Sequence, residues 1–250
     1  MGTVICMYIV MLGMCFGSFL NVVATRAVEE KELFGGRSRC DGCGHQLAWY
    51  DLIPFISFIW LKGRCRYCRR KIGIRHLVVE IIDGFACLLA FSAIGFSLDF
   101  IFVFMLIQLF ILLSLIDWDV MIIPDLLLVL LIFPVISLCI SHPEFSLVDR
   151  VIGMFCVSGM MIIINCLVAE SFGGGDVKLM MICGFLLGWK LSLLSGFFGV
   201  VIAGIYAMYL LNTKKVGRKD HIAFGPFLCL GVFLALLYGR VVLNWYLSLF

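Results

Sequence analysis

The sequence predicts an all-α polytopic membrane protein with about eight transmembrane helices and a small cytoplasmic zinc-binding domain. The first supporting observation is composition: of 250 residues, 63% are hydrophobic and 14% are charged. Soluble globular domains average roughly 45–50% and 25%. A soluble fold of this composition would lack the polar side chains to cover its surface, so we expect the chain to be solvated by lipid. Disorder, a secreted disulfide scaffold and a nucleic-acid binder are excluded.

The second observation is the length and spacing of the apolar runs. A helix needs roughly 20 apolar residues to cross the hydrocarbon core. The runs are too long and too uniformly apolar for the strands of a membrane barrel, so we expect helices. The predicted spans cover about 4–24, 78–96, 100–116, 126–141, 151–169, 177–190, 192–211 and 223–248. The sixth of these is short and continues almost directly into the seventh, so the boundary between these two is the least defined.

The distribution of positive charge predicts the orientation. Eleven of the 19 Lys and Arg residues, with five acids, lie between Arg26 and Arg75, and four more lie in 212–222. The loops around 95–99 and 141–149 contain neither Lys nor Arg. The positive-inside rule then places both basic segments in the cytoplasm and the N-terminus outside. Because the first run precedes its first basic residue, we expect a retained span rather than a cleavable signal peptide.

These patterns divide the chain into three predicted parts. Residues 1–25 form the first transmembrane helix, 26–77 a cytoplasmic zinc-knuckle domain, and 78–250 a seven-helix transmembrane catalytic domain. The zinc prediction rests on two C-x-x-C pairs, Cys40/Cys43 and Cys65/Cys68. Four thiolates suit a tetrahedral zinc, and a closed four-sulfur site is structural rather than catalytic. A dithiol redox pair, four unconnected cysteines and His45 as a replacement ligand are the alternatives, whereas a disulfide framework does not suit a cytoplasmic loop.

Acidic residues border two of the apolar runs. The third run ends at Asp117, with Asp119 and Asp125 shortly after it, and Asp176 follows the fifth run. Charges in or beside spans cost roughly 2.5–3.5 kcal/mol on insertion scales, which makes them functional candidates. The predicted topology places both clusters at the cytoplasmic boundary. Two carboxylates at close range share a proton, so that one holds it while the other activates a water, as in aspartic proteases.

A glycine triplet precedes the second of these aspartates. Gly173, Gly174 and Gly175 favour an unwound backbone that a substrate can approach closely, and an extended peptide could pair there by strand addition. The alternative is that the aspartates are interfacial caps, with Asp176 beginning a helix and Asp125 following a proline at a helix start.

Six motifs occur in one order along the chain and resemble those of a known family. They are Gly17-Ser-Phe-Leu-Asn21-Val-Val, Trp49-Tyr-Asp-Leu-Ile-Pro54 between the cysteine pairs, His76-Leu-Val-Val-Glu80, Asp117 with Pro124-Asp125, Glu170 to Lys178 as E-x-x-G-x-G-D-x-K, and Phe224-Gly-Pro-Phe227. Together they resemble the type IV prepilin leader peptidase family, a group of GxGD-type intramembrane aspartyl proteases. The chain departs from the family pattern at Ala27 (usually Leu-Pro after the arginine), at Asp83 (usually Thr) and at Gly174.

The resemblance implies roles for individual residues. Asp117 and Asp176 match the catalytic aspartates, the four cysteines match the zinc ligands, and Asp125, Glu170 and Lys178 match residues that support the aspartates. As a candidate catalytic residue Asp119 ranks below Asp117, because the family motif has Pro-Asp seven and eight positions after its aspartate, and Pro124-Asp125 stand at that distance from Asp117.

The resemblance also implies the substrate and the place of reaction. Substrates would be type IV prepilins or pseudopilins, with a basic leader ending in Gly before an apolar helix that usually starts with Phe. Cleavage would use an activated water at the cytoplasmic face of the bacterial inner membrane. Many members also methylate the new N-terminal amine with S-adenosylmethionine. No G-x-G-x-x-G fingerprint is present, so this second activity rests on resemblance alone, with the cytoplasmic loop and Gly17 to Asn21 as its expected location.

Two other classes compete with a protease. A proton-coupled transporter would use the buried aspartates as a proton relay and would show a pseudo-symmetric pair of interrupted helices. Only one glycine-rich break and no inverted repeat is found in the sequence. A scaffold for a secretion apparatus would have no use for facing carboxylates.

Overall fold

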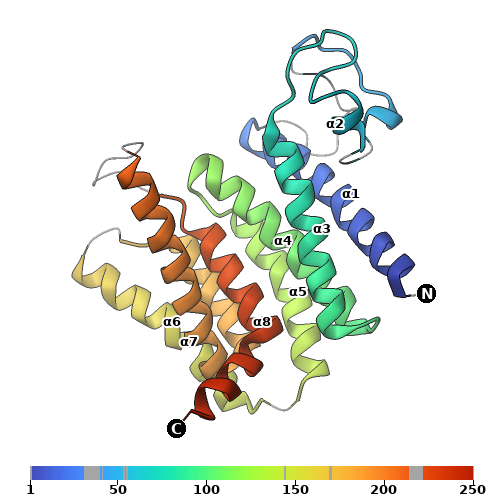
Figure 1. Ribbon diagram of the computed structural model, residues 1–250. Coiled ribbons are helices and arrows are strands. Elements are labelled where there is room, and N and C mark those ends of the chain that lie inside the picture. Colours follow the sequence, from blue (N-terminus) through green and yellow to red (C-terminus); the bar gives the residue numbers. More distant parts are fainter. Residues whose placement is uncertain are drawn as a thin grey trace. The chain divides into compact units, whose positions relative to one another are not determined.

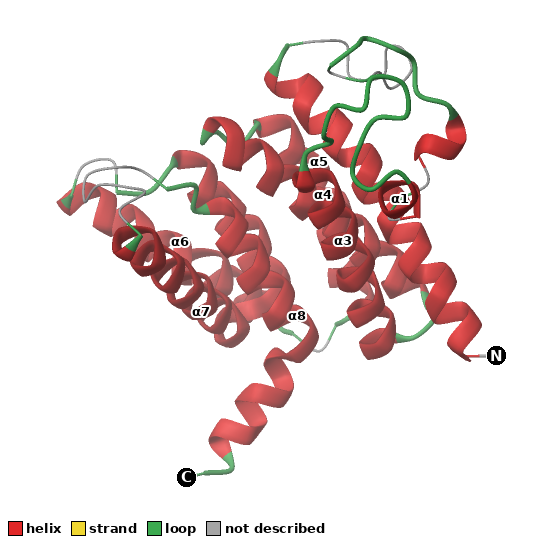
Figure 2. Ribbon diagram, turned by 45° about the horizontal axis from the view of Figure 1, so that its top comes forward, coloured by secondary structure: helices red, strands yellow, loops and turns green. Residues whose placement is uncertain are grey.

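The computed structural model describes residues 2–30, 40, 42–52, 54, 56–143, 145–168, 171–213 and 222–249. These residues form helices, turns and isolated bridges, such as the antiparallel bridge between Arg64 and Lys71, but no strand (Figure 2). The chain divides into two compact units, Met1–Phe100 and Ile101–Phe250, called unit 1 and unit 2 below. The division into 1–25, 26–77 and 78–250 stays a prediction.

Unit 1 is built on a pair of long helices, α1 (Gly2–Val28) and α3 (Ile74–Ile94), which lie side by side (Figure 1). Their contact uses a G-x-x-x-G pattern in α1. A Cβ atom at Gly13 would lie 2.9 Å from the Cα of Gly84, and one at Gly17 would lie 3.0 Å from the Cβ of Asp83. Small residues therefore let the two backbones approach closely, as is common for helices that associate in lipid.

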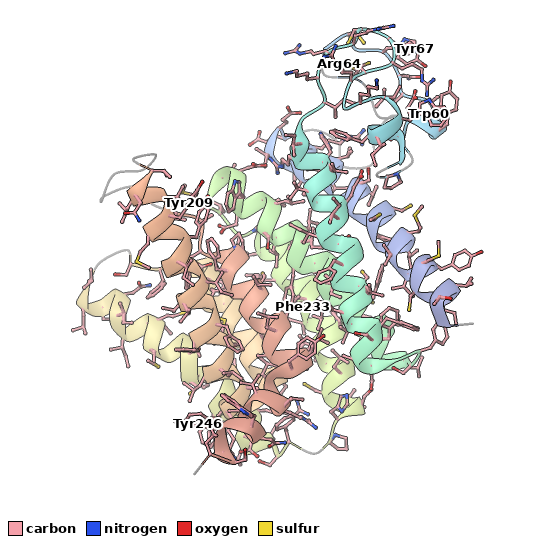
Figure 3. The ribbon with its side chains drawn as sticks, viewed as in Figure 1. Trp60, Arg64, Tyr67, Tyr209, Phe233 and Tyr246 are labelled. Atoms are coloured by element: carbon pink, nitrogen blue, oxygen red, sulfur yellow. The ribbon has the colours of Figure 1, made fainter. Side chains whose placement is uncertain are left out.

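The polar segment of unit 1 connects α1 with α3. It contains the 3₁₀ turn η1 (Trp49–Leu52), the short helix α2 (Ile56–Trp60) and both C-x-x-C pairs. Figure 3 shows Trp60, Arg64 and Tyr67 on this segment, at the end of α1 and α3 that lies away from the N-terminus. Trp60 is 80% exposed.

Unit 2 contains most of α4 (Leu98–Val120) and all of α5 (Asp125–Ser141), α6 (Leu147–Leu167), α7 (Gly174–Asn212) and α8 (Gly225–Leu247). Helix α7 packs against α5, α6 and α8. Large apolar side chains also cover the outer helix faces, which is expected where lipid replaces water. The fully buried side chains of this unit include Leu106, Leu113, Leu131, Leu179, Met180, Leu187 and Leu228.

Helix α7 is interrupted at Gly188, whose backbone (φ 71°, ψ 173°) is not helical. A straight helix of 39 residues would measure about 58 Å, almost twice the roughly 30 Å of the hydrocarbon core. A Cβ atom at Gly184 would lie 3.1 Å from the Oγ of Ser192, although residues eight apart in a straight helix are about 12 Å apart. The chain therefore folds back at Gly188, close to the predicted boundary between the spans 177–190 and 192–211.

A buried arginine holds this break against the end of α5. Arg150 of α6 is 5% exposed and donates hydrogen bonds to the carbonyl oxygens of Cys139 (3.1 Å) and His142 (2.6 Å). It also donates to those of Phe185 and Leu186, both at 3.4 Å. These carbonyls end α5 and the first half of α7, where helical hydrogen bonds stop and a positive charge is favourable.

Six described helices are long and apolar enough to cross a membrane: α1, α3, α4, α6, α7 and α8. Helix α5, with 17 residues, is apolar but shorter. Tyr209 near the end of α7 and Tyr246 near the end of α8 lie at opposite ends of unit 2 (Figure 3), where interfacial aromatic residues are common in membrane proteins. The predicted all-α class with several membrane spans is confirmed by the length and composition of these helices.

The close contact of α6 with the break in α7 predicts a sharp difference between two glycines of one helix. A Cβ atom at Gly153 would lie 2.5 Å from the carbonyl oxygen of Gly184, whereas one at Gly159 meets no described atom within 4 Å. We expect Gly153→Val to destabilise the fold by about 1–3 kcal/mol and Gly159→Val to change it little. Thermal unfolding in detergent measures both, and equal losses would show that this contact does not hold the helices together.

Candidate active site and metal centre

Asp117 lies in the last turn of α4 and is 5% exposed. Its Oδ2 accepts a hydrogen bond of 3.0 Å from the backbone N–H of Gly225, the first residue of α8. A Cβ atom at Gly225 would lie 2.8 Å from this oxygen, so a glycine is needed for the contact. The N-terminus of a helix carries a partial positive charge, which favours a carboxylate at this position.

Asp176 lies in the first turn of α7 and is 8% exposed. It interacts with the backbone N–H of Gly173, the residue before α7, and electrostatically with Asp117. Its Oδ1 is buried and has no hydrogen-bond partner in the described part of the chain. The two predicted aspartates are therefore brought together, each beside the start of a helix, and one carboxylate oxygen remains for a water or a substrate group.

Ile123, in the loop between α4 and α5, contacts the starts of both α7 and α8. A Cβ atom at Gly175 would lie 2.7 Å from the Cβ of Ile123, and one at Gly225 would lie 3.3 Å from its Cδ1. Glycines at these two positions let the starts of α7 and α8 close on the loop that follows Asp117. Ile123 was not singled out from the sequence, and Gly225 was named only as part of the Phe224-Gly-Pro-Phe227 motif, since only the folded chain brings both residues to the aspartates.

The glycine triplet is less unwound than the sequence predicts. Gly174 and Gly175 already belong to α7, and only Gly173 is extended (φ −64°, ψ 144°). A Cβ atom at Gly174 would meet no described atom within 4 Å. An acidic side chain in the first turn of a helix satisfies free backbone N–H groups, so Asp176 favours a helix where three glycines alone favour an unwound segment.

The segment before the triplet is held by Asn165, which the sequence analysis missed. The backbone N–H of Phe172 donates to Oδ1 of Asn165 at 2.8 Å, and Nδ2 of Asn165 donates to the carbonyl of Phe172 at 3.0 Å. Both backbone groups of Phe172 are thus occupied and unavailable for strand addition. Its ring faces that of Phe224, with 5.4 Å between the centroids. The two rings flank Gly173 and Gly225, the residues whose N–H groups contact the aspartates.

The other predicted residues around the aspartates form one ion pair. Lys178 Nζ lies 2.6 Å from Oδ1 of Asp125, with the two side chains 55% and 72% exposed. An exposed pair of this kind contributes up to about 1 kcal/mol, so it links the starts of α5 and α7 only weakly. Asp119 is exposed, unlike Asp117. Glu170 lies outside the described residues.

The four predicted cysteine ligands also come together, in the polar segment of unit 1. The sulfur atoms of Cys40, Cys43, Cys65 and Cys68 all lie within 4.8 Å of one another. The Sγ atoms of Cys40 and Cys68 are 3.8 Å apart, and a tetrahedron with metal–sulfur bonds of about 2.3 Å has edges of about 3.8 Å. The donor set therefore fits a thiolate-bound metal ion. The ring of His45 instead faces Tyr67, with centroids 3.7 Å apart.

The acidity of the thiols favours a cation at their centre. The backbone N–H of Gly42 lowers the pKa of Cys40 to about 7. At Cys68 the N–H of Arg70 also lowers the pKa, but desolvation and the neighbouring thiols outweigh it and raise the pKa to about 11. Four thiols at this distance cannot all ionise unless a cation lies among them.

A salt bridge links this cluster to the Trp49–Pro54 motif that lies between the two cysteine pairs in the sequence. Nε of Arg66, between Cys65 and Cys68, lies 2.7 Å from Oδ1 of Asp51, whose side chain is 2% exposed. The Arg66 guanidinium also lies over the ring of Tyr50, at 5.0 Å from its centroid. Two motifs that are separate in the sequence thus form one structure.

Comparison with known proteins matches both units. Residues 11–94 match the model of the bacterial peptidase A24 N-terminal domain, and residues 103–208, which include Asp117 and Asp176, match that of the type IV leader peptidase family. The chain is similar to proteins named prepilin leader peptidase/N-methyltransferase. The one from Myxococcus xanthus is 33% identical over 87% of this chain and 67% of its own length. The one from Bacillus subtilis is 28% identical over 95% of this chain and 96% of its own length. The one from Legionella pneumophila is 30% identical over 86% of this chain and 77% of its own length. No solved structure matches the chain.

The sulfur cluster predicts one tightly bound metal ion per chain. We expect Cys65→Ser to remove the metal, since Cys65 is the most buried of the four ligands, and Cys15→Ser, an exposed cysteine of α1 outside the cluster, to retain it. Because binding displaces thiol protons, affinity should fall as the pH falls below the pKa of Cys68, about 11, and more steeply below that of Cys40, about 7. Elemental analysis of both purified variants, and of the unchanged protein at two pH values, measures the bound metal. Equal metal content in the two variants would contradict the assignment of the cluster as the metal site.

Proposed function

Because this chain belongs to the type IV prepilin leader peptidase family, we propose that it cleaves the leader from type IV prepilins or pseudopilins and methylates the new N-terminal amine. The observation that carries the peptidase proposal is the buried pair Asp117 and Asp176, held against the starts of α8 and α7. A proton-coupled transporter, the alternative function, has no support among the related proteins.

The reaction we propose is hydrolysis by a water bound between the two carboxylates. One carboxylate accepts a proton from the water while the other, protonated, donates its proton to the oxygen of the scissile carbonyl. Collapse of the tetrahedral intermediate releases a carboxylate on the leader and an α-ammonium group on the mature pilin. The N–H of Gly225 holds one oxygen of Asp117 in place, and the unpartnered Oδ1 of Asp176 is suited to contact the water.

We place the reaction at the cytoplasmic face of the bacterial inner membrane, with the N-terminus of the chain outside. The clustered Lys and Arg of 26–75 support this orientation, as does the position of the dyad at the end of α4 and the start of α7. With the two halves of α7 counted separately and α5 included, the helices would cross the bilayer eight times. The polar leader of a prepilin would then lie in water and its apolar helix in lipid.

The rings of Phe172 and Phe224 would receive the first residue of the mature pilin. Each ring adjoins a glycine whose backbone N–H contacts one aspartate. An apolar side chain on the new N-terminus can pack against these rings, where aromatic pairs contribute about 0.5–1.5 kcal/mol beyond their buried area. This placement supports a preference for an apolar, aromatic residue after the cleaved bond.

The cysteine cluster would hold a structural Zn²⁺ ion. Four sulfur ligands complete a tetrahedral shell and leave no position for a substrate, so the ion orders the segment between α1 and α3 and takes no part in hydrolysis. Methylation would use S-adenosylmethionine as the donor of the methyl group, in keeping with the N-methyltransferase names of the related proteins.

Replacement of either aspartate by asparagine tests the peptidase proposal. Asp117→Asn and Asp176→Asn preserve shape but cannot transfer the proton, so we expect each to lower cleavage of a synthetic prepilin by about 10²–10⁴-fold. Asp119→Asn, an exposed aspartate of the same helix, is the matched control and should cleave normally. The assay uses purified protein in detergent with unchanged metal content, and cleavage that persists in either dyad variant refutes the assignment.

The approach of α7 to Ile123 provides a second, purely geometric test. Gly175→Ala would push the first turn of α7 away from Ile123 and move Asp176 with it. A shift of about 1 Å can cost about 10²-fold in rate, so we expect a large loss of cleavage with little loss of stability. Gly204→Ala in the same helix, where a Cβ atom meets no described atom within 4 Å, is the control. Similar cleavage rates for both variants would show that this contact does not position the dyad.

A further inference from the structure

We propose that a buried polar cluster in unit 1, formed by Asn21 of α1 with His76, Glu80 and Asp83 of α3, binds an α-ammonium group and is the site of N-methylation. The inference rests on the proposed function and assigns its second activity to named residues. None of these side chains belongs to the aspartate pair of unit 2.

The four side chains lie along one contact between α1 and α3. His76, Glu80 and Asp83 are spaced four and three residues apart, which places them on one face of α3. Nδ2 of Asn21 lies 2.6 Å from Nδ1 of His76, and a Cβ atom at Gly17, one turn before Asn21, would lie 3.2 Å from Oδ2 of Asp83. The polar groups therefore follow the face of α3 on which α1 packs.

Three of the four groups are deeply buried in otherwise apolar helices, and His76 is half-buried. Asn21 is 1%, Glu80 7% and Asp83 0% exposed, and both helices are apolar enough to cross a membrane. Two acids in such helices are unfavourable relative to apolar residues, whereas the glycine contacts alone suffice for close packing. Close packing therefore does not account for their presence.

The asparagine points to the kind of ligand. Its side-chain nitrogen donates, so in this arrangement Nδ1 of His76 is the acceptor. Oδ1 of Asn21 is buried and has no hydrogen-bond partner in the described part of the chain. An unmet buried acceptor of this kind destabilises the fold unless a donor satisfies it. With two acids on the same face of α3, this oxygen is suited to a ligand that brings N–H donors and positive charge, such as a primary ammonium.

Both participants in N-methylation carry an α-ammonium group: the new N-terminus of the pilin and the amino-acid end of S-adenosylmethionine. For reaction, the pilin ammonium must lose one proton, and in this proposal the Glu80 carboxylate, one turn from His76 on the same face of α3, accepts it. The amine lone pair then forms a bond to the methyl carbon, and the carbon–sulfur bond breaks with its electron pair left on sulfur. The products are a methylated ammonium and a neutral thioether, so charge and atoms balance.

The test uses the full-length protein in detergent with a synthetic prepilin. Glu80→Gln keeps the size of the side chain and removes its charge, and Glu29→Gln, an exposed glutamate just after α1, is the matched control. Mass spectrometry of the product measures cleavage and methylation separately. We expect Glu80→Gln to cleave within about twofold of the wild type and to methylate about 10²-fold more slowly or worse, and Glu29→Gln to do both normally.

Equilibrium binding, measured without turnover, identifies the source of the ammonium. Labelled S-adenosylmethionine and a mature pilin peptide that begins with Phe are titrated separately. Weaker binding of the methyl donor alone in Glu80→Gln assigns the cluster to its amino-acid end, and weaker binding of the peptide alone assigns it to the pilin amine. Asn21→Ala, which removes the unmet acceptor without adding bulk, should weaken the same ligand, and it serves as the variant if Glu80→Gln does not fold.

Unchanged methylation and unchanged binding of both ligands in these variants would overturn the proposal. A wild type that cleaves no prepilin would refute the proposed function instead, and the two binding titrations would still decide whether the cluster holds an ammonium.

Discussion

The hydrogen bond from the backbone of Gly225 to Asp117 is the contact on which unit 2 depends. It joins the end of α4 to the start of α8, and Ile123 brings the start of α7 to the same point. A carboxylate buried among apolar helices requires hydrogen-bond donors, and the first turn of a helix is the part of the backbone that has them free. The site therefore gathers two helix starts around a pair of acids.

Close approach of backbones is what allows such a site to form in lipid. Lipid tails solvate apolar side chains, so helices associate through packing and hydrogen bonds rather than by exclusion from water. Glycines supply that packing in both units: Gly13, Gly17 and Gly84 between α1 and α3, and Gly153 and Gly184 between α6 and α7. Rigid contacts of this kind hold the buried polar groups in defined positions.

The sequence alone predicted the features that depend on local pattern. Apolar runs gave the helices, paired C-x-x-C spacings gave the sulfur cluster, and acids at the ends of two runs gave two acidic clusters. The family resemblance then selected Asp117 and Asp176 from these clusters. What could not be predicted depends on residues that meet only in the fold: Ile123 against Gly175, and Asn165 around Phe172. The prediction of an unwound backbone at Gly174 and Gly175 was wrong, because the local preference of glycine for a non-helical chain is weaker than the helix start that Asp176 stabilises.

The chemistry of the two reactions explains why one chain would carry two buried polar sites of different composition. Hydrolysis needs two acids that exchange a proton across a water, and it generates an ammonium that did not exist in the precursor. Methylation needs that ammonium bound and then deprotonated, which calls for acceptors rather than for a shared proton. The pair in unit 2 has one unmet carboxylate oxygen, whereas the cluster in unit 1 adds an unmet amide oxygen and an imidazole to its acids. The acids favour the positive charge of an ammonium and the amide oxygen accepts one of its N–H groups, so the cluster suits the amine product of hydrolysis better than a neutral peptide or water.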